Sequence, residues 1–127
     1  MKTNFSKMWK RSKQPRKQKK YRYLAPLHIK SKFMASHLSK ELRQKYNRRS
    51  ISVRKGDKVQ VMRGQFKKKI GKIAKADIKK SKVYIDGIEI IKKDGTKTLY
   101  PVDPSNLMIL ELNLEDKKRL KKSVRKW

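Results

Sequence analysis

Cysteine is absent from the 127 residues of this sequence, and the first forty residues contain no aspartate or glutamate. The absence of cysteine excludes disulfide frameworks, cysteine-based zinc sites and thiol chemistry. The longest apolar run, residues 107–110 with Leu112 beyond Glu111, is too short to span a membrane. The start of the chain has no apolar segment of signal-peptide length, so we expect the protein to reside in the cytoplasm.

Basic residues dominate what is present. The chain carries 39 lysines and arginines against 10 acidic residues, a formal net charge of +29. A compact protein with this charge would repel itself unless a polyanion neutralised it, so we expect a nucleic-acid partner. The charge is uneven: residues 1–50 carry +16, residues 51–112 carry +8 and residues 113–127 carry +5. These three segments are the predicted divisions of the chain.

Only residues 51–112 show the pattern of a globular domain, and a chain of this length has room for one. Alternating apolar residues predict short strands, and turn signals at Gly64 and Asp94-Gly95 separate some of them. The strands are expected at 58–62, 70–76, 83–86, 88–92, 98–102 and 107–112. The last is apolar on both faces, which favours a central position. Without a long helix between them, these strands indicate a mostly β fold, a small antiparallel barrel.

The flanking segments lack this pattern. Residues 10–23 show neither a helical nor a strand period, so we predict an extended basic N-terminal arm that becomes ordered on its partner. In residues 36–46, Leu38, Leu42 and Tyr46 recur at i, i+4 and i+8, which predicts a short amphipathic helix. At the other end, Asn113 is placed to cap a basic C-terminal helix or tail over residues 113–127.

Catalysis is hard to build from these residues. The two histidines, His28 and His37, have no carboxylate nearby in sequence, and without cysteine they match no recognised metal spacing. Asp86 and Glu89 are close in sequence, but nothing around them provides the matched, perturbed pKa values that acid–base catalysis needs. We therefore predict that the protein is not an enzyme and holds no metal or cofactor.

Recognition of nucleic acid is easier to build. The arm leads into Tyr21-Arg22-Tyr23, where arginine neutralises phosphate and tyrosine either stacks on an unpaired base or packs on the barrel. Trp9 and Trp127 are open to the same two interpretations. A solvated charge run is the alternative for the arm, and the missing acids disfavour it. A second basic cluster surrounds the turn after residue 62, where Gly71 either admits phosphate or forms a kink that closes the barrel.

Several blocks of the sequence resemble a known family. Residues 54–64, Arg-Lys-Gly-Asp-Lys-Val-Gln-Val-Met-Arg-Gly, followed by Phe66-Lys67 and by residues 70–73, look like a KOW motif. With residues 83–88 and 101–106, the motif resembles the L24 family of large-subunit ribosomal proteins. Residues 12–42 resemble the N-terminal extension of the archaeal and eukaryotic branch of that family.

The resemblance implies an SH3-like barrel that binds large-subunit ribosomal RNA, chiefly its 5′ region, near the polypeptide exit, and that supports early subunit assembly. The implied partners are this RNA, neighbouring large-subunit ribosomal proteins and nascent-chain targeting factors at the exit, with no homo-oligomer and no membrane span. The implied location is the cytoplasmic ribosome. A KOW transcription-elongation or chromatin-associated protein is the alternative, although such a factor would normally need a polymerase-binding domain. A membrane-surface protein is disfavoured because the basic segments lack an apolar face.

Three positions depart from the family pattern. Lys68 stands where glycine is common, Gln65 where an acid is common and Asp103 where histidine is common. A lysine adopts a glycine-only backbone at a cost, so we expect the turn at Lys68 to be reshaped. Charge and resemblance together predict the following RNA-contacting residues: Lys10, Arg11, Lys13, Arg16, Lys17, Lys19, Lys20, Tyr21, Arg22, His28, Lys30, Arg48, Arg49, Arg54, Lys55, Arg63, Gly64, Lys67, Lys68, Lys69, Lys72, Ser105 and Asn106.

Overall fold

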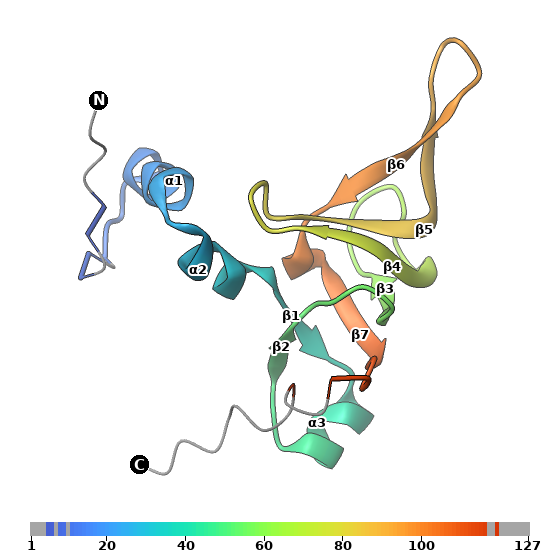
Figure 1. Cartoon of the computed structure of the whole chain (residues 1–127), viewed down its shortest axis with the longest axis horizontal. Coiled ribbons are helices and arrows are strands. Elements are labelled where there is room, and N and C mark those ends of the chain that lie inside the picture. Colours follow the sequence, from blue (N-terminus) through green and yellow to red (C-terminus); the bar gives the residue numbers. More distant parts are fainter. Residues whose placement is uncertain (1–4, 7, 10, 117–118, 120–127) are drawn as a thin grey trace.

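A single seven-stranded sheet in the order β2-β1-β7-β3-β4-β5-β6 organises the fold. The structure, a computed structural model, describes residues 5–6, 8–9, 11–116 and 119. The sheet curls into a small SH3-like half-barrel, and α1 and α2 lie to one side of it (Figure 1). The mostly β, SH3-like fold predicted from the sequence is confirmed.

The elements have the following bounds. The strands are β1 (Ala35–Leu38), β2 (Ser50–Ser52), β3 (Lys58–Val61), β4 (Ile70–Asp77), β5 (Lys82–Ile91), β6 (Lys97–Val102) and β7 (Leu107–Glu111). The helices are α1 (Pro15–Leu24), α2 (Leu27–Lys30) and α3 (Lys40–Tyr46), with the 3₁₀ helices η1 (Ser31–Met34) and η2 (Pro104–Asn106). The strands predicted at 58–62, 70–76, 98–102 and 107–112 are confirmed within one residue at each end. The last is central, because β7 pairs with both β1 and β3.

The two strands predicted at 83–86 and 88–92 form one continuous strand, β5. Gly87 lies within it at φ 85°, and the register of β5 against β6 shifts between Tyr84 and Glu89. A bulge of this kind interrupts the alternation of apolar and polar side chains while the strand continues. The sequence pattern therefore resembles two strands although there is only one. The turn predicted at Asp94-Gly95 is confirmed, because it joins β5 to β6.

The helix predicted over residues 36–46 is wrong for its first four residues, because residues 36–38 form a strand and Ser39 is the extended residue that caps the helix. Ser36 and Leu38 are buried on either side of half-buried His37, in strand β1. This strand pairs parallel to β7 and antiparallel to β2. It thereby covers an edge of β7 that would otherwise leave backbone N–H and C=O groups unpaired. The helix itself begins only at Lys40, as α3.

The hydrophobic core lies inside the curl of the sheet. Its fully buried members come mainly from the predicted barrel strands, among them Val59, Val83 and Leu107. Met34 and Leu38, from the N-terminal extension, are buried in the same core at 2% and 1% exposure. The extension is therefore anchored to the barrel at residues 34–38, with Leu42 packed against the same core.

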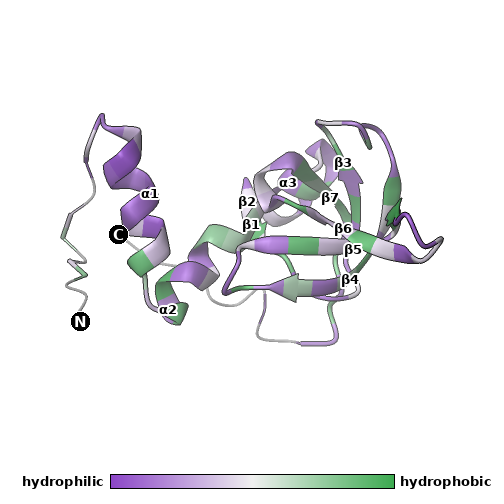
Figure 2. Cartoon of the chain, turned by 90° about the horizontal axis from the view of Figure 1, so that it is seen from above, coloured by the Kyte–Doolittle hydropathy of each residue, from purple (hydrophilic) through white to green (hydrophobic). Residues whose placement is uncertain are grey.

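Helix α1 departs most from the sequence-based expectation, because residues 10–23 were predicted to be extended. Pro15 occupies the first turn of the helix, where its missing N–H removes no hydrogen bond. The lysines, arginines and glutamine that follow are good helix formers. No residue of α1 is buried, and Figure 2 shows the helix as mostly hydrophilic. Hydrophobic periodicity therefore carried no signal for it.

The predicted C-terminal helix falls largely on residues 117–118 and 120–127, which lie outside the described residues. Residues 113–116, which are described, are not helical. The Asn113 side chain accepts a hydrogen bond from the N–H of Glu115 at 3.1 Å, which closes a turn. Beyond it, the side chain of Arg119 turns back into the barrel, where it is 2% exposed.

Candidate nucleic-acid interface

The residues predicted to contact RNA fall on three parts of the fold. One group lies on α1, on the residues just before it and on α2. A second flanks β2, and a third surrounds the turn between β3 and β4. Lys10 lies outside the described residues. We refer to these parts as the helical group, the β2 group and the turn group.

The helical group concentrates positive charge on α1. The helix carries five exposed basic side chains and no acid: Arg16, Lys17, Lys19, Lys20 and Arg22. Several of these lie three or four positions apart, where like charges repel each other and destabilise an isolated helix. Arg11 and Lys13 precede the helix, and His28 and Lys30 follow on α2. An external polyanion would relieve this repulsion.

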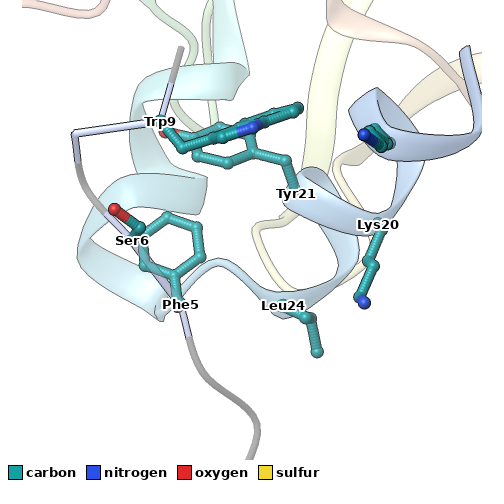
Figure 3. A pocket seen from close by; sticks show the side chains of 7 residues that line it. Phe5, Ser6, Trp9, Lys20, Tyr21 and Leu24 are labelled. Carbon is teal, nitrogen blue, oxygen red and sulfur yellow. The ribbon is translucent and has the colours of Figure 1, made fainter. Parts of the chain in front are cut away.

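Tyr21 belongs to a small aromatic cluster outside the barrel core. Its ring centroid lies 5.0 Å from that of Phe5, 5.4 Å from that of Trp9 and 6.3 Å from that of Phe33. Figure 3 shows the Trp9 and Tyr21 rings lying against each other, with Phe5 beside them. Tyr23, on the same helix, is 80% exposed. Neither tyrosine belongs to the barrel core, so packing on the barrel does not account for them.

The β2 group borders an open cavity. Arg48 and Arg54 line a space of about 350 Å³, together with Lys32 and Arg119. Arg49 and Lys55 are exposed nearby in sequence. Arg54 is paired with Asp116 at 2.6 Å, and both side chains are almost half exposed. Part of the charge of Arg54 is therefore already balanced within the protein.

Beside this cavity lies a buried ion pair that sequence reasoning missed. The carboxylate of Asp57 is fully buried and accepts hydrogen bonds from Arg119 Nη1 and Nη2 at 2.6 and 2.5 Å. It also accepts the N–H groups of Arg54 and Asn113 at 3.0 and 2.8 Å. Arg119 donates further to the carbonyls of Asn113 and Ser52, each at 2.9 Å. The pair therefore ties the C-terminal segment to the barrel.

The sequence contains one faint signal for this pair. Asp57 is the only acid between Glu41 and Asp77, in an otherwise basic stretch. A single carboxylate among many basic residues is a candidate for a buried ion pair, because a carboxylate is buried only when it has a charged or hydrogen-bonding partner. Arg119, by contrast, is one of seven basic residues in the last fifteen, and nothing in the sequence separates it from the others.

The turn group presents its charges on a loop closed by backbone hydrogen bonds. Arg63, Lys67, Lys68 and Lys69 are all exposed. The N–H of Lys68 donates to the carbonyl of Val61 at 2.7 Å, and the N–H of Val61 donates to that of Lys69 at 2.9 Å. Gly64 lies at φ 92°, the positive value expected from its turn position. Gly64 is also exposed, so its backbone is accessible at the same turn as the lysines.

Two contacts join this turn to other parts of the barrel. The Phe66 ring packs on Tyr100 of β6, with the centroids 5.1 Å apart. The N–H of Met62 donates to the carbonyl of Asn106 at 2.8 Å, which brings η2 against the turn. The fold thus places Ser105 and Asn106 beside the basic turn, although they are forty residues away in sequence. Lys72 follows on β4, exposed.

Lys68 does not avoid the backbone conformation that was expected to cost it energy. Lys68 itself takes φ 71°, in the left-handed region that favours glycine. The lysine therefore keeps the backbone that a glycine would adopt.

Gly71 lies where two strands approach each other closely. A Cβ at this position would lie 2.5 Å from the carbonyl oxygen of Asp86 and 2.8 Å from Cγ2 of Ile85. Glycine thus permits β4 to approach β5 closely, which agrees with the structural interpretation of this residue.

Three aspartates are engaged in turns. Asp77, Asp94 and Asp103 accept the backbone N–H groups of Lys80, Thr96 and Ser105 at 3.2, 3.0 and 3.0 Å. The hydrogen bonds from Thr96 lower the pKa of Asp94. Asp103 also accepts the hydroxyl of Ser105 at 2.9 Å, so it shapes the start of η2. These aspartates hold the loops in place and leave much of the basic surface to an external anion.

His37 lies in an environment that perturbs its pKa. Burial lowers its pKa below 6.5, and the positive charges of Arg43 and Arg49 lower it further. Within the described part of the chain, no three histidine, aspartate or glutamate side chains gather as a metal site. Nor is any helix in that part long and apolar enough to cross a membrane.

The chain matches one protein family over nearly its whole length. The family model, described as ribosomal proteins L26 eukaryotic and L24P archaeal, matches residues 12–126. The matched range contains α1, all seven strands and every described member of the three basic groups except Arg11.

Proposed function

This chain belongs to the family of ribosomal proteins that comprises eukaryotic L26 and archaeal L24P, and from that membership we propose that it binds large-subunit ribosomal RNA. A member of this family is a structural constituent of the ribosome. We infer further that the chain binds chiefly the 5′ region of that RNA, near the polypeptide exit, and supports early assembly of the subunit. Its neighbours there are other large-subunit proteins and, at the exit, nascent-chain targeting factors. Its location is the cytoplasmic ribosome, and its role is structural rather than enzymatic.

The observation that carries the proposal is the unbalanced charge of α1. Its five basic side chains are exposed, the helix has no acid, and none of its residues is buried. A ten-residue helix without a buried face is marginal by itself in water, so its order depends on what covers it. RNA phosphates supply the opposite charge, and their contact with Lys and Arg releases counterions.

The two barrel groups fit the same role. The turn group presents exposed lysines beside the backbone of Gly64, and backbone N–H groups near a turn favour anions. Recognition by shape and phosphate is expected, because double-stranded RNA offers side chains little sequence information in its deep groove. The barrel alone does not separate a ribosomal protein from the alternative, a KOW transcription factor, but the N-terminal extension is part of the matched family. The family match that includes this extension therefore favours the ribosomal role.

Sedimentation in high salt tests the proposal. Tagged protein is expressed in cells, and the lysate is separated on a density gradient at a salt concentration that removes loosely bound basic proteins. We expect the protein to remain with large subunits, because the fit of the folded protein within the particle holds it even where salt weakens the individual phosphate contacts. Recovery with polymerase, with membranes or at the top of the gradient would overturn the proposal.

A further inference from the structure

A cavity of about 300 Å³ opens beside α1 and is lined by residues that the barrel does not use. Its apolar wall consists of Phe5, Trp9, Tyr21 and Leu24, and Lys17 and Lys20 stand at its border. Figure 3 shows Trp9 and Tyr21 on one side of this space, with Phe5, Leu24 and Lys20 around it. Flat aromatic rings and flexible cations thus meet in one small site.

We propose that this cavity takes one unpaired nucleotide of ribosomal RNA, with its base against the aromatic wall and its phosphate at Lys17 and Lys20. The inference rests on the proposed function, because the nucleotide comes from the RNA that the basic surface binds. It goes further by assigning Phe5 and Leu24, which neither charge nor motif placed at an RNA contact, and by choosing stacking for Trp9, which the sequence left open. It also assigns stacking, rather than packing, as the role of Tyr21.

The chemistry of the lining selects this occupant. Every nucleobase has a π face that stacks on aromatic rings, and a nucleotide joins that face to a phosphate. A volume of about 300 Å³ is at the lower end for small-molecule sites, which suits one nucleotide and excludes an RNA helix. The exposed charges of Arg16 and Lys19 continue from the site along α1. A strand of RNA therefore finds further phosphate partners beside the site, which an isolated apolar ligand would not use.

A neighbouring cavity supports an extended strand. This second space, about 610 Å³, shares Trp9 and Tyr21 with the first and adds Phe33 and Arg22. The Arg22 guanidinium lies 5.0 Å from the centre of the Phe33 ring. Arginine and aromatic planes are both platforms for stacked bases. The same two rings therefore serve two adjoining openings.

A purely structural role for the aromatic rings beside α1 does not explain why they are partly exposed. A cluster that served only to hold the N-terminal segment together would bury its members, because burial is the source of hydrophobic stabilisation. No residue of α1 is buried, and Phe5, Trp9 and Phe33 are all partly exposed. The exposed ring area is what a stacked base would cover.

Tryptophan fluorescence tests the inference directly. The chain has two tryptophans, so the Trp127→Phe variant of the full chain leaves Trp9 as the only indole. This variant is titrated with a single-stranded nine-nucleotide RNA, and separately with an abasic oligomer of equal length and charge. We expect the RNA to quench Trp9 and to bind about 5- to 100-fold more tightly than the abasic oligomer, as stacking predicts. Equal affinities without quenching would overturn the inference.

Variants on α1 separate stacking from folding. Tyr21→Leu should lose most of the preference for the base-containing RNA and keep its affinity for the abasic oligomer, whereas Tyr21→Phe should keep both. Tyr23→Leu is the matched control, because Tyr23 is on the same helix, 80% exposed and outside the lining. Equal loss in both leucine variants would refute the assignment of Tyr21. Circular dichroism reports whether α1 persists in each.

The same titration separates the two proposals. Salt-dependent binding of both oligomers with no preference for bases would refute the nucleotide site and leave the proposed function standing. Failure of the protein to bind any RNA would refute both.

Discussion

Replacing Asp57 by asparagine perturbs the buried ion pair that joins the C-terminal segment to the barrel. Asparagine keeps the shape of the side chain but removes its charge and places an NH₂ group where donors already point. The Arg119 side chain, 2% exposed, would then carry a buried charge without its carboxylate. Breaking a buried pair in this way costs about 3–5 kcal/mol. Since small domains have a net stability of about 5–15 kcal/mol, the free protein would lose a large fraction of it.

Urea denaturation of the free protein, followed by far-ultraviolet circular dichroism at constant salt, measures this loss. The control is Asp77→Asn, because Asp77 is partly exposed and its carboxylate accepts the N–H of Lys80 at 3.2 Å. The control should cost less than about 1 kcal/mol, because the Oδ1 of asparagine can still accept the same N–H. In Asp57→Asn/Arg119→Met the unpaired charge is gone, so the double variant should be more stable than the sum of the single effects predicts. Equal effects of Asp57→Asn and Asp77→Asn would refute the reasoning.

Three further predictions concern single positions. Lys68→Gly should raise the free energy of unfolding by about 1 kcal/mol, because φ 71° strains an L-residue; an unchanged urea midpoint would contradict this. Gly71→Ala should lower it by about 1–3 kcal/mol through the contact with Asp86, whereas Lys72→Ala on the exposed side of β4 should have little effect; equal midpoints would refute the packing role. The pKa of His37 is lowered in the folded state by burial and by Arg43 and Arg49, so the unfolded chain binds the proton first and stability should fall as the pH drops below about 6.5. His37→Gln should remove this part of the pH dependence, and an unaltered pH profile would show that another group is responsible.

The barrel strands were predictable because each buries one face, and alternation records burial directly. Strand β3 illustrates this, with Val59 and Val61 buried and their neighbours half exposed. Helix α1 was not predictable by the same rule, since it buries nothing and leaves no apolar period. Strand β1 was read as helix because Leu38 also fits a helical spacing with Leu42. Its strand conformation follows from pairing with β7, a contact seventy residues distant in sequence.

For the candidate site, composition identified the kind of residue but not the arrangement. The basic charge of the sequence indicated Arg54 and the lysines of the turn as RNA-contacting residues. It could not reveal that Arg54 is paired with Asp116, or that η2 lies against the turn through Met62 and Asn106. Such pairings depend on tertiary contacts between segments far apart in the chain. The aromatic wall beside α1 was equally hidden, because Phe5 and Tyr21 meet only once the helix has formed.

The salt dependence of RNA affinity tests the central claim, that this protein holds large-subunit ribosomal RNA through phosphate contacts of its basic groups. The affinity is measured from low to moderate salt for a transcript of the 5′ region and for one of equal length from another part of the same RNA. We predict tighter binding to the 5′ transcript and a steep linear fall of log K with log salt. Changing Lys17, Lys19 and Lys20 together to glutamine should make the slope shallower by about 2–3, at roughly 0.7–0.9 per phosphate contact. A nearly flat salt dependence, or equal affinity for the two transcripts, would contradict the account.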